Sequence, residues 1–457
     1  MQYSVDILRS RQNMVRYNWG FQFALWCSIL WGTFYLGIEL LVHNDGFMGV
    51  PFAARDPFHT ACVVAALTAV MLAVFCVIWV AISGKLTDWA KMMCSFRHEN
   101  RLLLGGAVLG GMAAWLSYIV GNWVDTTFAV GMVMFYPVIG GIVAHLWYRE
   151  RISRRCILGL AVVVTGCIVL YMPAFADSLG STVVLSCFMG LLAGTGWGLE
   201  AVLATRAMDV VDSEVSVAVR YTYEALIWIV FSLVMSFMPQ VMPIQAYYIS
   251  VLTNPISVVL LLIITLCFSL NYFAWYKSFI LCGVAKGLAI SDLSGFVTVV
   301  LGMFLLTSFP SWSEVFACMI MAVGVFIVYN DVGRALTVIR DIDLTPLSRR
   351  VELARSTDRL TEKTAAMMTI AENGVLWDYE VAQMMTEGIK EHRRLHRTRN
   401  QIRTYLIESA AAGMITAVDG RIDDGDQFSK GKLLSRYALT EFGLERLRHM
   451  GFVEERR

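Results

Sequence analysis

The chain has 457 residues, of which 57% are hydrophobic and 16% are charged, with a net charge of +1 and a mean hydropathy of +0.61. Soluble globular proteins are roughly half apolar and a quarter charged, so this composition excludes an ordinary soluble enzyme, a disordered chain and a secreted disulfide scaffold. Residues 1–330 contain 16 basic and 16 acidic side chains, whereas residues 331–457 contain 21 and 20. We therefore expect a domain boundary near position 331.

Apolar segments of about 20 residues recur before that boundary and predict transmembrane helices. A short N-terminal segment, residues 1–17, precedes them. Ten spans are expected, at 18–42, 60–82, 102–121, 124–147, 156–173, 182–204, 221–239, 255–276, 285–307 and 313–330. The predicted fold is thus an all-α polytopic membrane domain over residues 18–330.

The basic residues indicate the orientation of these spans. With the N-terminus inside, fifteen of the sixteen Lys and Arg residues before position 331 lie on the inner side and only Arg55 lies outside. Loops rich in Lys and Arg face the cytoplasm. We expect a multi-pass protein of the plasma (inner) membrane with both termini in the cytoplasm. One span more or fewer would move half of these loops to the other side of the membrane and remove the excess of basic residues on the inner side. The count of ten is therefore favoured.

An internal repeat relates residues 18–173 to residues 182–330. A shift of 158 positions pairs Tyr118 with Tyr276, Gly166 with Gly324, and Tyr171 with Tyr329, and a shift of 166 pairs Trp31 with Trp197. Because each half holds five spans, the halves have opposite orientations. Inverted repeats of this kind are typical of secondary transporters, whose binding site lies near the membrane midplane.

Several short motifs carry a family resemblance. They are Trp31-Gly32 in the first span, Tyr136-Pro137-Val138 in the fourth, and Arg149-Glu150-Arg151-Ile152 followed by Gly159 and Gly166. Over residues 18–330 they resemble the drug/metabolite transporter superfamily, in particular its ten-span type with two EamA-like repeats. The second repeat departs from the pattern, since Gly295 replaces the proline. The resemblance implies a carrier that moves a small organic solute by alternating access. Enzyme activity is not expected, because no nucleophile–base set or metal-ligand spacing stands out in the sequence.

Asp292 in the ninth span is the strongest candidate site residue. A charge inside a span usually faces a cavity or a partner, so its carboxylate could bind a cationic group or exchange a proton. The alternative is a structural ion pair with Lys277 or Lys286.

Three glutamates form a second group of candidates. Glu39 lies near the outer end of the first span and could simply reach the interface. Glu200 and Glu224 are expected to pair with Arg206 and Arg220.

Aromatic and amide side chains add a further set of candidates: Trp31, Tyr35, Trp115, Tyr118, Tyr136, Trp197, Asn271, Tyr272 and Tyr276. Aromatic faces near a lone carboxylate suit a cationic or aromatic solute through cation–π attraction. Interfacial belts and helix packing are the alternative explanation. The Gly105-Gly106 and Gly110-Gly111 pairs indicate close helix packing and no chemistry.

Residues 331–360 are predicted to form a linker with a charged stalk helix that begins at Thr345-Pro346. Residues 361–457 then show helices at 364–372, 378–388 and 400–412, strands at 414–418 and 433–439, and a closing helix at 440–449. A polar hairpin is expected at Asp419-Gly420 and Asp424-Gly425. This small α+β pattern resembles winged helix-turn-helix domains.

In such domains the third helix can enter the DNA major groove, which makes Arg397, Arg399 and Arg403 candidates for phosphate contacts. A solvated face or docking on anionic lipid fits these residues equally. Two alternatives to transport therefore stay open: a membrane solute sensor that signals through this domain, and a membrane-tethered DNA-binding regulator.

The remaining expectations concern partners and cofactors. The ten cysteines are dispersed without a CxxC or Cys/His cluster, so neither a metal site nor a cofactor is expected. The expected partners are a small-molecule substrate, the lipid bilayer and a proton or other coupling ion. A homodimer is left open, and nucleic acid is the least favoured partner.

Overall fold

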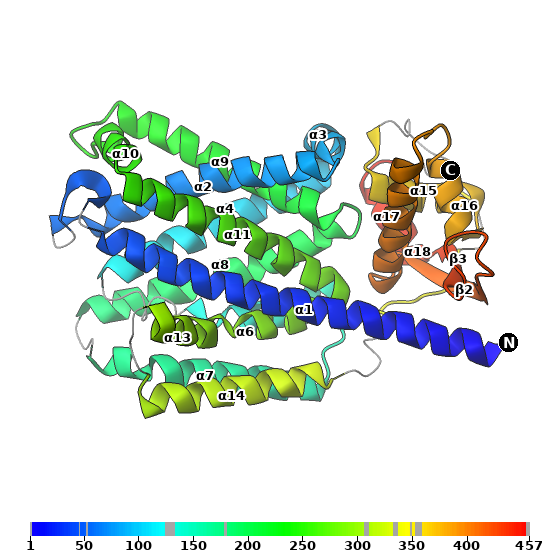
Figure 1. Ribbon diagram of the computed structural model, residues 1–457, viewed down its shortest axis with the longest axis horizontal. Coiled ribbons are helices and arrows are strands. Elements are labelled where there is room, and N and C mark those ends of the chain that lie inside the picture. Colours follow the sequence, from blue (N-terminus) through cyan, green and yellow to red (C-terminus); the bar gives the residue numbers. More distant parts are fainter. Residues whose placement is uncertain are drawn as a thin grey trace.

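The computed structural model describes residues 2–44, 46–51, 54–123, 133–177, 181–305, 310–331, 337–347, 350–351 and 359–453. A helical bundle precedes a smaller domain of helices and strands, which lies against one end of the bundle (Figure 1). We call this the domain-facing end. The N-terminal part of the first helix extends past it, and Arg9 there donates to the carbonyl of Asp419 at 3.3 Å.

The bundle contains long helices joined by shorter elements. Its first half contains α1 (Gln2–His43), α2 (Pro57–Ile82), α4 (Arg97–Trp123), α6 (Tyr136–Tyr148) and α7 (Arg154–Asp177). Its second half contains α8 (Ser181–Met208), α9 (Ser213–Ser236), α11 (Pro255–Cys282), α12 (Val284–Ser291), α13 (Ser294–Leu305) and α14 (Trp312–Tyr329). The shorter elements are η1 (Phe47–Gly49), α3 (Leu86–Ser95) and α10 (Ile244–Thr253).

Local chemistry fixes where several helices begin. The carboxylate of Asp56 accepts from His59 N–H and caps α2, whose first residue is Pro57. The side chain of Asp212 caps α9 and that of Asn254 caps α11 in the same way. Such caps satisfy backbone donors that have no partner inside the helix.

Eight helical segments in the described part of the chain are long and apolar enough to cross a membrane. A polytopic membrane protein is thereby confirmed. The two helices at the predicted fourth and fifth spans, α6 and α7, are not among the eight. Residues 124–132, in the fourth predicted span, lie outside the described residues, so the count of ten stays a prediction.

Helices from the two halves of the bundle alternate in space. Helix α1 packs on α11 and α13, and α4 and α6 both pack on α8. Helix α2 lies against α9, and α7 against α14. In the last pair, a Cβ at either Gly159 or Gly324 would lie 2.9 Å from the carbonyl oxygen of the other residue, so glycine is needed on both helices.

The C-terminal domain surrounds a small antiparallel sheet with strand order β1-β3-β2. Its elements are α15 (Glu362–Asn373), β1 (Leu376–Trp377), α16 (Asp378–Met385), α17 (His392–Ala411), β2 (Ile415–Ile422), β3 (Leu433–Leu439) and α18 (Glu441–His449). The sequence pattern missed the two-residue β1 and started the third helix eight residues too late.

The hairpin expected at Asp419-Gly420 and Asp424-Gly425 is present but turns later than predicted: Asp419-Gly420 lies within β2, and Asp424-Gly425 lies in the connecting loop. Pairing between β2 and β3 continues to Ile422 opposite Leu433, with a bulge between Ala417 and Asp419. The connecting loop follows at Asp423, whose carboxylate accepts four backbone N–H groups of residues 425–429.

The stalk helix expected from Thr345-Pro346 is also wrong for the described residues. Leu347 N–H donates to Leu439 O at 2.8 Å, and Pro346 forms a bridge with Thr440. Upstream, Ile339 N–H donates to Ala411 O at 2.9 Å, and Arg151 N–H donates to Ile339 O at 2.9 Å. The backbone groups of this extended segment thus form hydrogen bonds with neighbouring segments of the chain, so they do not require the internal hydrogen bonds of a helix. Residues 348–349 and 352–358 lie outside the described residues.

Candidate functional site

Asp292 lies at the break between α12 and α13, not inside a continuous helix. Its side chain is 0% exposed, and its Oδ1 atom has no hydrogen-bond partner. The thiol of Cys167 lies 3.8 Å from Oδ2. Among the described residues no cation pairs with Asp292, because Lys286 pairs with Asp331 and Lys277 pairs with Glu408. The two lysines that were the alternative partners of Asp292 therefore pair with other carboxylates.

A cluster of buried aromatic rings surrounds Trp31 on α1. The rings within 6.2 Å of its centroid belong to Tyr35, Tyr136, Trp197, Phe268 and Trp275, from helices α1, α6, α8 and α11. The hydroxyl of Tyr136 lies 2.8 Å from that of Ser291, the residue before Asp292. The structure thus brings Trp31, Tyr35, Tyr136 and Trp197 into one cluster that reaches Asp292 and also contains Phe268 and Trp275.

Polar atoms in and near this aromatic cluster lack partners. The indole N–H groups of Trp197 and Trp275 and both polar atoms of the Asn271 amide are buried without a hydrogen bond. A buried polar group without a partner costs about 1–3 kcal/mol. These donors and acceptors are therefore groups that a polar solute can satisfy.

A second cluster is ionic and lies around Arg220 on α9. Its guanidinium donates to Glu200 at 2.7 and 3.2 Å and also to Glu224. Tyr276 and Tyr272 on α11 donate to the same Glu200 carboxylate at 2.9 and 3.3 Å. Each of the five residues is at most 5% exposed. We call these five residues the ion cluster; it holds one more carboxylate than cation.

Arg206 does not share in the pairing predicted for it. Its guanidinium lies 5.9 Å from the ring centroid of Phe442 in α18, and its carbonyl oxygen accepts from Arg446. The reason is its position: Arg206 lies in the last turn of α8 at the domain-facing end, whereas Arg220 follows the first two turns of α9 into the bundle.

Glycines on α4 provide the space for the ion cluster. A Cβ at Gly110 would lie 1.8 Å from Oε2 of Glu200 and 2.2 Å from Nη2 of Arg220. A Cβ at Gly111 would approach Glu224 to 3.3 Å. The sequence assigned these glycines to helix packing alone. This role could not be predicted from the sequence, because Glu200 and Arg220 are far from Gly110 along the chain.

Three further candidates lie apart from the Trp31 cluster. Trp115 lines a pocket of about 360 Å³ between α2, α4 and α9, which Glu224 also lines. Its other walls are apolar and include Phe58, Met112 and Ile227. Tyr118 is buried on α4, and Glu39 is half-buried near the end of α1 away from the C-terminal domain.

The three arginines considered for phosphate contacts all have partners within the chain. Arg397 donates to Ser83 O at 3.2 Å, and Arg403 pairs with Asp378 at 3.3 Å. The guanidinium of Arg399 lies 5.7 Å from the ring centroid of Phe428. Arg397 thus contacts the helix bundle.

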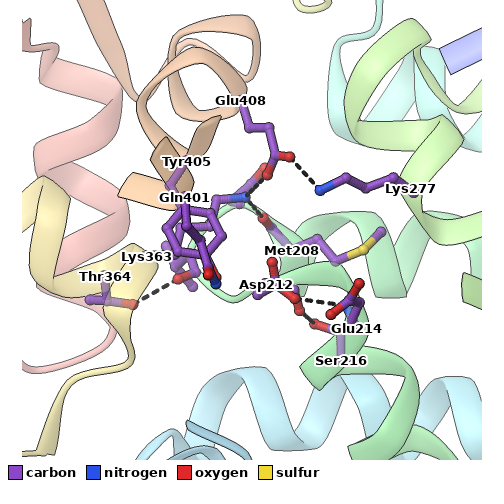
Figure 2. A network of polar contacts seen from close by, with 12 residues as sticks. Met208, Asp212, Glu214, Ser216, Lys277, Lys363, Thr364, Gln401, Tyr405 and Glu408 are labelled. Carbon is purple, nitrogen blue, oxygen red and sulfur yellow. Dashed lines mark hydrogen bonds and ion pairs between the residues drawn. The ribbon is translucent and has the colours of Figure 1, made fainter. Parts of the chain in front are cut away.

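Buried ion pairs join the C-terminal domain to the bundle (Figure 2). Glu408 on α17 accepts from Lys277 on α11 at 2.5 Å and from Lys363 on α15 at 3.4 Å. Lys363 also donates to Met208 O at 2.7 Å, and burial lowers the pKa of Lys363. Nearby, burial opposes ionisation of Asp212, but the ammonium groups of Lys85, 3.0 Å away, Lys277 and Lys363 together outweigh burial and lower the pKa of Asp212.

A second junction lies at Asp209, between α8 and α9. Its carboxylate accepts from Tyr148 at 2.9 Å and pairs with Arg340 of the linker. Arg446 of α18 lies 3.6 Å from both Asp209 and Glu99. Burial raises the pKa of Asp209 to about 6. No pattern in the sequence predicts this junction, because its members are far apart along the chain.

Comparison with known proteins assigns part of the bundle. Residues 184–330 match the EamA-like transporter family. No curated protein matches the chain. A solved crystal structure, described only as that of a protein, is 14% identical and covers 67% of this chain and 95% of its own, with a TM-score of 0.49. The chain thus contains an EamA-like transporter family domain, which supports its place in the drug/metabolite transporter superfamily.

Proposed function

We propose that the bundle is a secondary transporter of a small organic solute, with a preference for cationic or aromatic compounds. It works by alternating access between two inverted five-helix repeats in the plasma membrane, with both termini in the cytoplasm. The family match over residues 184–330 supports transport, and the placement of the basic residues supports the orientation.

The packing of the helices supports the inverted repeats. We count α12 and α13 as one interrupted span, so that each half has five. If the spans are numbered in order, α1 on α11 is a contact of the first span with the eighth, and α4 on α8 is the third with the sixth. Exchange of the two halves converts one contact into the other. The same exchange relates α6 on α8 to α13 on α1, and leaves α2 on α9 and α7 on α14 unchanged. This is the behaviour expected of a pseudo-two-fold arrangement.

The observation that carries the proposal is the lone buried carboxylate of Asp292 at a helix break. Interrupted helices near the interface of two repeats commonly bind substrate and coupling ions in transporters. A buried carboxylate without a cationic partner is expensive unless it binds a cation or a proton. The Trp31 cluster beside it adds aromatic faces that attract an organic cation.

The C-terminal domain, in our proposal, is a winged-helix-type module that regulates the transporter. The order of its elements and its β1-β3-β2 sheet support this assignment. Its third helix, α17, packs on the bundle through Glu408 and Arg397. A helix used in this way is not available to a DNA major groove, so we favour regulation over DNA binding.

The test is flux into proteoliposomes with purified full-length protein, a panel of radiolabelled amines, amino acids and sugars, and an imposed pH gradient. We expect gradient-driven uptake of an organic cation, and a loss of roughly tenfold or more in Asp292→Asn, since a charge-assisted contact contributes about 1.5–3 kcal/mol. Asp426→Asn makes the same chemical change on an exposed loop and should leave flux unchanged.

Two outcomes would contradict the proposal in different ways. Uptake that is equal in Asp292→Asn and in the unaltered protein removes Asp292 from the mechanism. Specific solute binding without flux in any gradient would replace transport by solute sensing.

A further inference from the structure

A polar cleft lies where the C-terminal domain meets the bundle. Its volume is about 440 Å³, and its walls come from the turn after α2 and from α15, α16 and α17. Three guanidinium groups line it, those of Arg393, Arg394 and Arg397, together with the carboxylates of Glu362 and Glu391. The ammonium of Lys85 also lines the cleft, but it is paired with Asp212 and Glu214.

The arginines are arranged to receive an anion. Positions 393, 394 and 397 fall on one side of the first turns of α17, because residues three and four apart are neighbours on a helix. Arg393 and Arg394 are exposed and make no hydrogen bond or ion pair with a described residue. Arg397 is held in place by the neutral carbonyl of Ser83, and no carboxylate pairs with it among the described residues. Guanidinium groups of this kind match the oxygens of a phosphate group.

The cleft lies at the level where a membrane span ends. Ser83 and Gly84 directly follow α2, which is one of the eight candidate spans. Apolar side chains stay exposed on both sides of this turn, with Ile82 75% and Leu86 44% exposed. An occupant of the cleft therefore meets a cationic wall and, beside it, apolar surface of the kind that contacts acyl chains.

The geometry points to a binding site for one anionic phospholipid, with its phosphate headgroup held by Arg393, Arg394 and Arg397 and its acyl chains along α2 and α3. A soluble phosphate compound satisfies the arginines but not the apolar border. Basic side chains next to a membrane attract anionic lipid headgroups in this way. The bound lipid would join α17 to the end of α2. This inference needs a membrane protein but no transport activity.

The test is native mass spectrometry of the delipidated full-length protein with phosphatidylglycerol or phosphatidylcholine of the same acyl chains. We expect a bound phosphatidylglycerol that phosphatidylcholine does not replace. The double variant Arg393→Gln, Arg394→Gln should lower its occupancy by about tenfold or more, because each basic residue near an anionic headgroup contributes on the order of 1 kcal/mol. Neither side chain has an internal partner among the described residues, so the variant should fold normally.

Two controls complete the experiment. Lys430→Gln with Lys432→Gln removes two exposed charges from the loop between β2 and β3, outside the cleft, and should retain the lipid. Arg393→Lys with Arg394→Lys keeps both charges and should restore part of the binding. Equal retention of both lipids, or an unchanged occupancy in the Gln variant, overturns the site. Displacement by millimolar inorganic phosphate as readily as by phosphatidylglycerol overturns the lipid as its occupant.

Discussion

Tyr276 and Lys277 are adjacent on α11 and connect two different parts of the molecule. Tyr276 donates a hydrogen bond of 2.9 Å to Glu200 in the ion cluster, whereas Lys277 pairs with Glu408 on α17. A displacement of this end of α11 therefore changes both contacts at once. We propose that docking of the C-terminal domain is coupled in this way to the geometry of the ion cluster, which would give its regulatory role a physical basis.

Lys277→Met should loosen the docked domain. The substitution leaves Glu408 with Lys363 as its only cation among the described residues. Breaking a fully buried pair costs about 3–5 kcal/mol, and because Lys277 is 22% exposed and one partner remains, we expect about 1–2 kcal/mol. Hydrogen exchange of α17 in the full-length protein measures this as faster amide exchange. The exposed Lys430→Met is the matched control, and equal α17 protection in both variants would show that the Lys277–Glu408 pair does not hold the domain in place.

Arg220→Met should destabilise the bundle more strongly. It leaves the carboxylates of Glu200 and Glu224 buried without their cation, at a cost of about 3–5 kcal/mol. Thermal unfolding in detergent measures the loss. The triple variant with Glu200→Gln and Glu224→Gln should recover most of it, because neutral amides need no counter-ion. A single variant that unfolds at the temperature of the unaltered protein would show that the pairing contributes nothing.

Gly110→Ala should disturb the ion cluster without changing its charge. The added methyl group would lie within 2.2 Å of both Glu200 and Arg220, so the pair must move. We expect a loss of roughly 1–3 kcal/mol, as for other overpacked interiors. Gly105→Ala is the control on the same helix: its Cβ would approach the side chain of Leu203 to 3.4 Å, an ordinary contact distance, and alanine is the better helix former. Similar unfolding temperatures for the two variants would contradict the proposed role of Gly110.

The membrane spans could be predicted because burial in lipid leaves its mark on composition. The segment predicted at 60–82 is α2, Pro57–Ile82, and the one predicted at 255–276 is α11, Pro255–Cys282. Single charged residues stand out within such apolar segments, so Asp292, Glu200 and Glu224 could be selected as candidates from the sequence. Their location required only the local sequence.

The partners of these residues could not be predicted, because they depend on contacts between distant segments. Arg206 and Arg220 are equally basic in the sequence, yet only Arg220 extends into the bundle between two carboxylates. The stalk helix failed for the same reason: Pro346 fits a helix start by itself, but Leu439 and Thr440 supply backbone partners for an extended chain. Docking of α17 on the bundle likewise left no local signal.

Docking of the C-terminal domain should weaken as the pH rises. Asp88 on α3 accepts from Glu362 N–H of α15 at 3.0 Å, and burial raises the pKa of Asp88 to about 7. The nearby carboxylates of Glu362 and Asp212 raise the pKa of Asp88 further, whereas the ammonium of Lys91 lowers it. Burial also raises the pKa of Glu362. An exposed aspartate titrates near 4. The docked form thus keeps a proton that the undocked form releases, and its stability falls between about pH 4 and pH 7.

Asp88→Asn should flatten this dependence, because the amide can still accept the N–H group but cannot ionise. Hydrogen exchange of α15, corrected for intrinsic rates between about pH 5 and pH 8, gives the docking free energy at each pH. We expect the slope to decrease and not to vanish, since Glu362 and Asp209 act in the same direction. Asp426→Asn on the exposed loop should keep the full slope. An identical slope in Asp88→Asn would mean that Asp88 is ionised in the docked protein and that its burial does not govern docking.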